Sequence, residues 1–336
     1  MSQRRVLITG ATGGLGIALV AEALARGHDV VATGRREEAG ARIKALGARF
    51  VAADLVKPEA DLPSLLTGCD SVIHAAALSA SWGPERDFVE ANLALTRRLL
   101  AAAASEWVSR FVFVSSPSIF AQFEDRISIG EDDAPKAHPL NAYARTKLAA
   151  ERLVLAPRAD DLDCCAIRPR ALVGPGDRVI LPRLAELARR PRMPLPRGGK
   201  ARIELTDLRD AAWAICEAEE RALSLAGLAI NISGGQPRSV REIAVALAGA
   251  LGTNPRLVSL PLGLARPLAS VLETLAHLVA SREEPVLTRY TLATLAYSQS
   301  FDLGPARRLL GYEPQHDALE TLLEEARSMS AAEVTT

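Results

Sequence analysis

The sequence predicts an α/β protein in which a doubly wound parallel sheet carries a smaller C-terminal α/β lobe. Short apolar, β-branched runs alternate with segments of helical spacing over the first half of the chain, a pattern typical of a parallel sheet covered on both faces. The long connections between these runs fit β-α-β crossovers. After about residue 170 the alternation loosens, and proline and glycine concentrate in residues 168–177 and 191–199. We therefore expect the sheet domain over residues 1–170, with some later segments returning to it, and the lobe mainly over residues 171–330.

The first half of the chain predicts five strands, and the second half predicts two notable helices. Helical spacing follows the first strand and is closed by Gly27. Ser239 and Glu242 stand at capping-box spacing before an apolar helix that ends near Gly252. The leucine-rich segment Leu257–Ala280 predicts a helix that covers a ligand as a lid, rather than one that lies on a membrane. The expected strands are Arg5–Thr9, Asp29–Thr33, Arg49–Asp54, Ser71–Ala76 and Arg110–Ser115.

Composition narrows the class of protein. Among 336 residues, 40 Lys and Arg balance 40 Asp and Glu, so a global electrostatic attraction to nucleic acid or to an anionic membrane is missing and neither partner is expected. No stretch is apolar and long enough to span a bilayer, and the N-terminus enters a strand without a signal-peptide segment. Since no metal-ligand spacing occurs, we expect a cytoplasmic protein without a metal and with buried, reduced thiols at Cys69, Cys164, Cys165 and Cys216.

A glycine-rich loop follows the first strand and opens the first helix. Gly10, Gly13 and Gly16 stand three residues apart, a spacing related to the three-glycine dinucleotide fingerprint but different from it. Glycines allow a tight turn and a close backbone approach, so that a pyrophosphate can bind the free N–H groups at the helix N-terminus. The position of the loop between a strand and a helix predicts a dinucleotide site.

The end of the second strand predicts which dinucleotide binds. An acidic residue there accepts from the ribose 2′-hydroxyl of NAD, but this strand ends in Gly34, Arg35 and Arg36. Two guanidinium groups suit a 2′-phosphate, so NADP(H) is expected over NAD(H). The alternative is a solvated arginine pair balanced by the glutamates that follow. Asp54, at the end of the third strand, is either an acceptor for the adenine amino group or a surface aspartate.

Tyr143 and Lys147 form the candidate catalytic pair. They are four residues apart in a helix-favouring stretch, so they share one helix face. A phenol has a reference pKa of about 10, and a nearby ammonium group lowers it. Ser115 and Ser116 end the fifth strand, where α/β sheets bind ligands, and can hold the oxygen of a substrate.

At this point the chain resembles an extended short-chain dehydrogenase/reductase, of the NAD-dependent epimerase/dehydratase superfamily, from about Arg5 to Tyr312. In detail it looks most like the 3β-hydroxysteroid dehydrogenase-like branch. One departure is Ala53, where the family usually has glycine before its adenine-contact aspartate. The matching motifs are the loop Thr9–Gly16, Asp54 with Leu55, the turn His74–Ala77, Asn92, Ser116, Tyr143 with Lys147, the loop Arg168–Gly176, Asn231–Ser233 and Leu310–Pro314.

The resemblance implies a Rossmann sheet and assigns roles to residues. Tyr143 is the expected general acid in reduction or base in oxidation, Lys147 lowers its pKa and binds ribose, and Ser116 polarises the carbonyl group. Asn92 is expected to fix helix geometry or a water that relays protons. The expected cofactor-binding residues are Gly10, Thr12, Gly13, Gly14, Leu15, Gly16, Arg35, Arg36, Asp54, Leu55, Ala75, Ala76, Ala77, Tyr143, Lys147, Pro169, Ala171 and Leu172.

For the reaction, the resemblance favours an oxidoreductase that interconverts a carbonyl and a secondary alcohol on a fairly apolar small molecule, such as a β-keto acid or a steroid-like compound. Dehydratases commonly have an acidic pair where Pro117 and Ser118 stand, and sugar-nucleotide enzymes usually have an arginine where Ile203 stands. A nucleotide-sugar epimerase or dehydratase is the alternative, and a non-catalytic NADP-binding protein is a third. A homodimer is expected. The candidate substrate residues are Trp82, Ser118, Arg170 and Tyr290, with Leu257–Leu278 as further wall.

Overall fold

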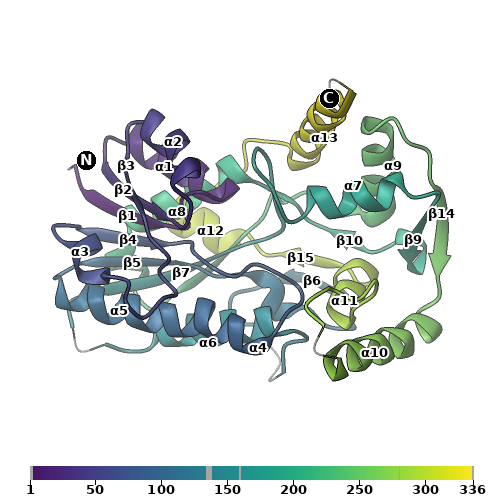
Figure 1. Cartoon of the computed structure of the whole chain (residues 1–336), viewed down its shortest axis with the longest axis horizontal. Helices are drawn as coiled ribbons and strands as arrows, with labels where there is room; N and C mark the ends of the chain where they lie inside the picture. Colours follow the sequence, from purple (N-terminus) through teal and green to yellow (C-terminus); the bar gives the residue numbers. More distant parts are fainter. Residues whose placement is uncertain (1–2, 134–137, 159, 280, 335–336) are drawn as a thin grey trace.

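A seven-stranded parallel sheet organises the N-terminal part of the molecule (Figure 1). The computed structural model describes residues 3–133, 138–158, 160–279 and 281–334. The spatial order is β12-β7-β5-β4-β1-β2-β3, so the chain order reverses between β1 and β4. Ligands bind in α/β proteins at such a switch point, beyond the carboxyl ends of the strands. The strands are β1 Arg5–Thr9, β2 Asp29–Gly34, β3 Arg49–Ala52, β4 Ser71–His74, β5 Arg110–Val114, β7 Asp163–Pro169 and β12 Ala229–Ile232.

Both faces of this sheet are buried under helices. Val6 and Ile8 of β1 belong to one hydrophobic core, whereas Leu7 belongs to the other. Successive strand residues point to opposite faces, so a run that is apolar throughout fills both cores. The first core packs against α1 Gly14–Ala25, α2 Glu37–Ala45, α8 Leu208–Glu220 and α12 Gly304–Leu310, and the second against α3 Leu62–Leu66, α5 Leu95–Ser105 and α6 Ala142–Leu155.

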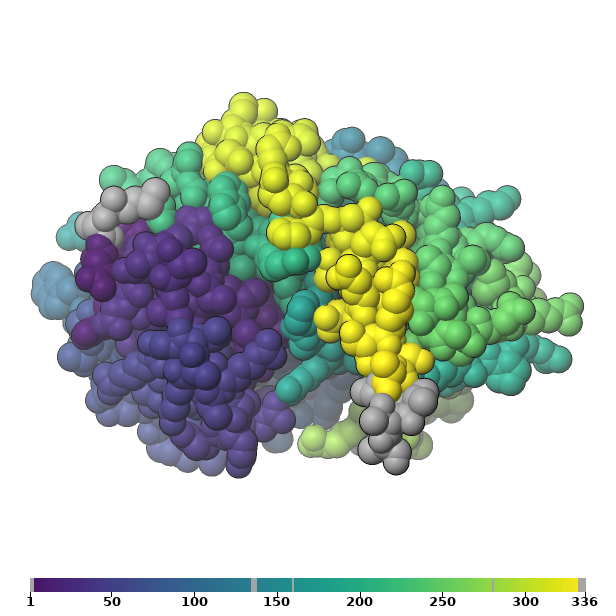
Figure 2. Space-filling model, turned by 90° about the horizontal axis from the view of Figure 1, so that it is seen from above, coloured from purple at the N-terminus to yellow at the C-terminus, as the bar shows by residue number. Residues whose placement is uncertain are grey.

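The lobe has its own small sheets and a third hydrophobic core. A four-stranded sheet has the order β13-β10-β15-β6, and β11-β8 and β14-β9 are two-stranded. In Figure 2 the N-terminal residues occupy one side, residues of about 240–290 the other, and the C-terminal residues lie across the junction. The strands are β6 Arg126–Ile129, β8 Leu172–Val173, β9 Arg192–Pro196, β10 Arg202–Ile203, β11 Thr206–Asp207, β13 Arg238–Ser239, β14 Arg256–Leu260 and β15 Gln299–Phe301. The longer helices are α7 Leu181–Arg189, α9 Val240–Ala250, α10 Leu262–Leu278, α11 Arg289–Ala296 and α13 Ala318–Val334.

The predicted fold class is confirmed, and the expected strands differ from the observed ones at their ends. The third, fourth and fifth strands end at Ala52, His74 and Val114, one or two residues earlier than expected, because the chain there leaves the sheet and turns into the loops that line a cavity. The capping box is present: the Ser239 hydroxyl accepts from the Glu242 N–H at 3.1 Å, and the Glu242 carboxylate accepts from the Ser239 N–H at 2.7 Å. All four cysteines are buried and unpaired.

The leucine-rich segment does not form the expected lid. Residues 256–260 form β14, which pairs with β9, and Pro261 separates this strand from α10. None of the residues 257–278 lines the cavity described below. α10 buries Ala265 and Ala269 and leaves Leu264 and Leu278 exposed. Ala280, the last residue of the expected helix, lies outside the described residues. No helix within the described ranges is both long and apolar enough to cross a membrane.

Candidate active site

One large cavity, of about 2030 Å³, lies at the carboxyl ends of the central strands and extends into the lobe. Pockets for a single small molecule are about 300–1,000 Å³, so this cavity has room for two ligands. The glycine-rich loop, Ser116, Tyr143 and residues of the lobe all line it. The lobe contributes an apolar wall that includes Met193, Leu195, Leu205, Ile243 and Leu247.

The glycine-rich loop forms a cradle that only glycine permits at two positions. Gly10 has φ +69°, and a Cβ atom there would lie 2.8 Å from the backbone of Ala76. A Cβ atom at Gly16 would lie 2.2 Å from the carbonyl oxygen of Gly10. Gly13 is the N-cap of α1 and provides no side-chain cap, so the first N–H groups of the helix are free to bind an anion. These residues fit the pyrophosphate of a dinucleotide.

The two arginines after β2 line the same cavity beyond the cradle. Arg35 and Arg36 are exposed, and neither forms an ion pair within the described ranges. Glu37, which was a candidate counter-charge, instead accepts from Lys44 at 2.6 Å. Asp54 also lines the cavity, and its Oδ1 accepts from the N–H of Val56 at 3.3 Å. Every residue expected to bind the cofactor lines this cavity.

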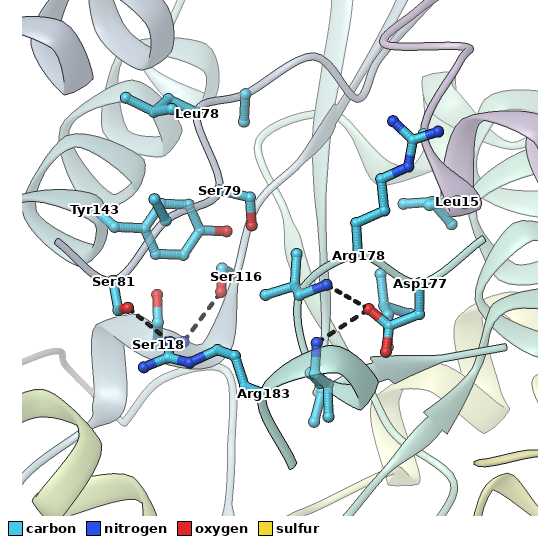
Figure 3. Close-up of a pocket in the computed structure, with 18 of the residues that line it drawn as sticks. Leu15, Leu78, Ser79, Ser81, Ser116, Ser118, Tyr143, Asp177, Arg178 and Arg183 are labelled. Carbon is cyan, nitrogen blue, oxygen red and sulfur yellow. Dashed lines mark hydrogen bonds between the residues drawn. The ribbon is translucent and has the colours of Figure 1, made fainter. Parts of the chain in front are cut away.

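Tyr143 lies in the first turn of α6 and points its hydroxyl into the cavity (Figure 3). Asn141 caps this helix, because its side chain accepts from the N–H of Ala144 at 2.9 Å. Burial raises the pKa of the Tyr143 phenol, and the neighbouring hydroxyl groups of Ser116 and Ser79 act in the opposite direction. The phenol is therefore protonated at neutral pH and can donate a proton.

Lys147 lies one turn further along α6 and is only 2% exposed. Its Nζ donates to the carbonyl oxygen of Val114 and lies 4.0 Å from the centre of the Phe113 ring. Burial lowers its pKa to about 7, although the charge of Glu151 opposes the change. Burial and the two serines are the causes that shift the pKa of the Tyr143 phenol, and the lowering of this pKa by Lys147 stays a prediction.

Asn92 does not line the cavity but connects the parts that do. It lies in a π-helical turn, Val89–Ala94, and such turns are frequent at functional sites. Its Oδ1 accepts from the N–H of Leu78 at 2.8 Å, and its Nδ2 donates to the Thr146 hydroxyl at 3.1 Å. Asn92 thereby ties the loop after β4 to α6, which agrees with the helix-fixing role expected for it.

His74 is a buried, neutral residue that connects the hydroxyl groups of Thr9 and Thr96. Its Nδ1 lies 2.8 Å from the Thr9 hydroxyl and its Nε2 lies 3.0 Å from the Thr96 hydroxyl. Complete burial, together with the charge of Lys147, lowers its pKa to about 3. Because the Thr9 hydroxyl also accepts from the N–H of Ala76 at 3.1 Å, this chain fixes the loop after β4 against β1.

Three of the four candidate substrate residues line the cavity, namely Ser118, Arg170 and Tyr290. The structure does not bring Trp82 there. Its indole ring packs on His277 with the ring centres 4.5 Å apart, and its Nε1 donates to the carbonyl oxygen of Ser281 at 3.1 Å. Trp82 therefore anchors its loop to the end of α10.

Ser79 and Arg178 are two of the cavity residues that were not predicted from the sequence. Ser79 follows the predicted cofactor turn by two residues, and its hydroxyl faces the Tyr143 phenol (Figure 3). Arg178 extends along the side of the cavity where Leu15 of the glycine-rich loop lies (Figure 3). Continuing the turn after Ala77 and the loop after Gly176 by two residues each would have found them. No cluster of metal-binding side chains occurs among the residues that the structure describes.

Comparisons with known proteins identify a family and several relatives of this chain. The model of the NAD-dependent epimerase/dehydratase family matches residues 6–233. A 2-alkyl-3-oxoalkanoate reductase of Stenotrophomonas maltophilia (strain K279a) is 34% identical over 334 residues, covering 98% of this chain and 100% of the relative. The uncharacterised protein YbjS of Escherichia coli (strain K12) is 33% identical over 316 residues, covering 92% and 93%. Among solved structures, MoeE5 in complex with UDP-glucose and NAD has a TM-score of 0.75 at 26% identity, covering 99% and 100% of the two chains.

The family match covers more than half of the chain, and both relatives match it over nearly their whole length. The chain thus belongs to the NAD-dependent epimerase/dehydratase family, with the fold of an extended short-chain dehydrogenase/reductase, and is an NAD(P)-dependent enzyme of the dehydrogenase/reductase class.

Proposed function

We propose that this protein is an NADP(H)-dependent oxidoreductase that interconverts a carbonyl group and a secondary alcohol on a fairly apolar small molecule. The observation that carries the proposal is that Tyr143 points its hydroxyl into the same cavity that the glycine-rich loop and the apolar wall of the lobe line. A proton donor in this shared cavity can serve a substrate in the lobe and a cofactor in the cradle together.

The residues of the chain have separate tasks in this proposal. The helix N-terminus at Gly13 binds the pyrophosphate, and Arg35 and Arg36 bind the 2′-phosphate. When bound, the dinucleotide supplies a hydride in reduction or takes one in oxidation. Ser116 donates a hydrogen bond to the substrate oxygen, and Tyr143 gives that oxygen its proton, since the raised pKa keeps the phenol protonated. Lys147 binds the ribose from its position one turn along α6.

Relatives and the cavity support the carbonyl substrate. The Stenotrophomonas relative is named for the reduction of a 3-oxoalkanoate, which is a ketone with apolar chains, and the lobe of this chain offers an apolar wall. The alternative is a nucleotide-sugar epimerase or dehydratase, favoured by the likeness to MoeE5 with its bound UDP-glucose and NAD. Against it, Ile203 lines the cavity where such enzymes usually have an arginine. The proposal also includes a cytoplasmic homodimer.

Replacing Tyr143 by phenylalanine tests the proposal. Tyr143→Phe removes the proton donor and keeps the ring, so we expect carbonyl reduction to fall by at least about 100-fold, the lower range for one general acid. NADPH binding, measured by fluorescence titration, should stay near wild type. Tyr297→Phe is the matched control, because Tyr297 packs on Phe123 outside the cavity. Retained turnover in Tyr143→Phe would exclude the role given to this phenol.

A further inference from the structure

Two arginines flank Pro169 at the end of β7, and they have different electrostatic environments. Arg168 is compensated: its Nε and Nη2 donate to the two carboxylate oxygens of Glu151 at 2.8 and 2.7 Å. Both side chains of this pair are almost completely buried. A buried charge with a bidentate partner is the arrangement that proteins tolerate.

Arg170 is as buried as Arg168 but has no such partner. It is 7% exposed and lines the cavity. Its Nε is enclosed without a hydrogen-bond partner, and its guanidinium group forms no ion pair within the described ranges. Burial lowers its pKa. An unpaired buried cation is costly, so its presence in a cavity points to a ligand that completes it.

The nearest acidic groups do not complete the site. Glu204 acts on Arg170 through its charge, but the Oε2 atom of Glu204 accepts from the Ser233 hydroxyl at 2.6 Å and from the Phe301 N–H at 3.2 Å. Burial raises the pKa of Glu204. Tyr290 of α11 acts on Arg170 electrostatically, and burial raises the pKa of Tyr290 to about 12, so it carries no charge at neutral pH.

The backbone holds Arg170 firmly in place. Its N–H donates to the carbonyl oxygen of Ile232 at 2.8 Å, and its carbonyl oxygen accepts from the Thr206 hydroxyl. Ala171, the next residue, has φ +41°, a conformation that residues other than glycine seldom adopt. Strain of this kind persists at functional sites where the surroundings impose it. A guanidinium group on such a fixed backbone is preorganised for a ligand.

The other cationic groups that line the cavity are engaged or exposed. Arg183 donates to the Ser81 hydroxyl at 2.7 Å and to the Glu284 carboxylate at 2.6 Å, and its side chain is 46% exposed. Arg178 is exposed and extends on the side of the glycine-rich loop (Figure 3). Arg170 thus differs from both in being enclosed and unpaired.

We propose that Arg170 binds a carboxylate group of the substrate, so that the enzyme acts on oxo acids and their hydroxy acids with apolar chains. This inference rests on the proposed function and assigns it a substrate class. Tyr290 lines the same cavity, and both Arg170 and Tyr143 act on it electrostatically. The planar fork of a guanidinium group matches a carboxylate in two hydrogen bonds, and Arg170 is then the residue that separates acids from esters and simple ketones.

The test compares 3-hydroxydecanoate with its methyl ester, oxidised with NADP⁺, which avoids the decarboxylation of a free 3-oxo acid. We expect the wild type to have the higher kcat/KM with the acid. Arg170→Gln should lower kcat/KM for the acid about 100-fold, which corresponds to about 2.7 kcal/mol at 1.36 kcal/mol per tenfold. The same variant should change kcat/KM for the ester by less than about threefold, which is under about 0.7 kcal/mol on the same conversion. Arg170→Lys keeps the charge without the fork and should lose about tenfold for the acid.

Arg183→Gln is the comparison variant, because it removes the same charge from the wall of the same cavity. It should leave the ratio of acid to ester activity unchanged. An unchanged ratio in both Arg170 variants would overturn the inference, and so would an equal loss with both substrates accompanied by a lower Tm. If the wild type oxidises the ester but not the acid, the inference fails and the proposed function stands. If it oxidises neither, the proposed function itself fails.

Discussion

The contribution of Arg35 and Arg36 to cofactor choice can be measured as the ratio of the affinities for NADPH and NADH. Both follow β2, both line the cavity, and neither has an ion-pair partner within the described ranges. Glu37, the nearest glutamate in sequence, is held by Lys44. A 2′-phosphate placed between the two guanidinium groups therefore meets two cations whose hydrogen-bonding groups are free. Replacing each arginine by alanine, singly and together, removes these contacts one at a time.

The magnitude follows from the exposure of the two side chains. A hydrogen bond to a charged group contributes about 1.5–3 kcal/mol, and water screening places exposed groups at the lower end. Two contacts of about 1.5 kcal/mol give about 3 kcal/mol, or roughly 150-fold at 1.36 kcal/mol per tenfold. We therefore expect the wild type to bind NADPH about 100-fold more tightly than NADH. The affinity of Arg35→Ala for NADPH should be about tenfold lower than that of the wild type, and the double variant should bind the two dinucleotides about equally.

Fluorescence titration of each variant with NADPH and with NADH is the assay. The affinity for NADH should stay constant across the series, and added salt should weaken NADPH binding more than NADH binding. Arg42→Ala is the matched control, because Arg42 is exposed on α2 and does not line the cavity. Equal wild-type affinities for the two dinucleotides would refute the reasoning, as would an Arg42→Ala effect as large as that of Arg35→Ala.

Two further predictions concern the cradle and the buried lysine. Gly16→Ala should lower the free energy of unfolding, measured by urea titration, by about 2 kcal/mol or more, which is the cost of overpacking a core. The reason is that the added Cβ atom would lie 2.2 Å from the carbonyl oxygen of Gly10. An unchanged unfolding midpoint would contradict this close contact. Lys147 has a folded-state pKa lowered to about 7, so the unfolded chain binds more protons between about pH 7 and pH 10.5. Relative to Lys147→Met, the wild type should therefore gain stability as pH rises through this window, by up to a few kcal/mol, and a pH-independent difference would contradict the burial cost.

The sheet and the central site were predictable because their signals are local. Alternation of apolar strands and helical spacing places β1 and the glycine-rich loop, and the four-residue interval places Tyr143 and Lys147 on one helix face. Strand ends are less certain from sequence, because the residues after His74 remain small and apolar although the chain has left the sheet.

The rest depends on contacts between distant segments. The sequence does not distinguish Arg168 from Arg170, because the partner Glu151 lies on α6 and only the fold brings it to one of them. Trp82 was expected in the substrate pocket as a large aromatic residue, but its contact with His277 holds its side chain outside the cavity. The pKa of Tyr143 likewise follows from burial and from hydroxyl groups on two separate loops, which no spacing reveals.

The central claim is that the cavity carries out net carbonyl–alcohol chemistry with NADPH. The most direct measurement follows hydride from 4-deuterated NADPH, both stereoisomers being tested, into methyl 3-oxodecanoate, with UDP-glucose as the competing substrate. We expect that one NADPH is oxidised for each secondary alcohol formed and that deuterium lies on the carbinol carbon. Conversion of UDP-glucose to an epimer with no net change in the dinucleotide, and with the keto ester untouched, would contradict it.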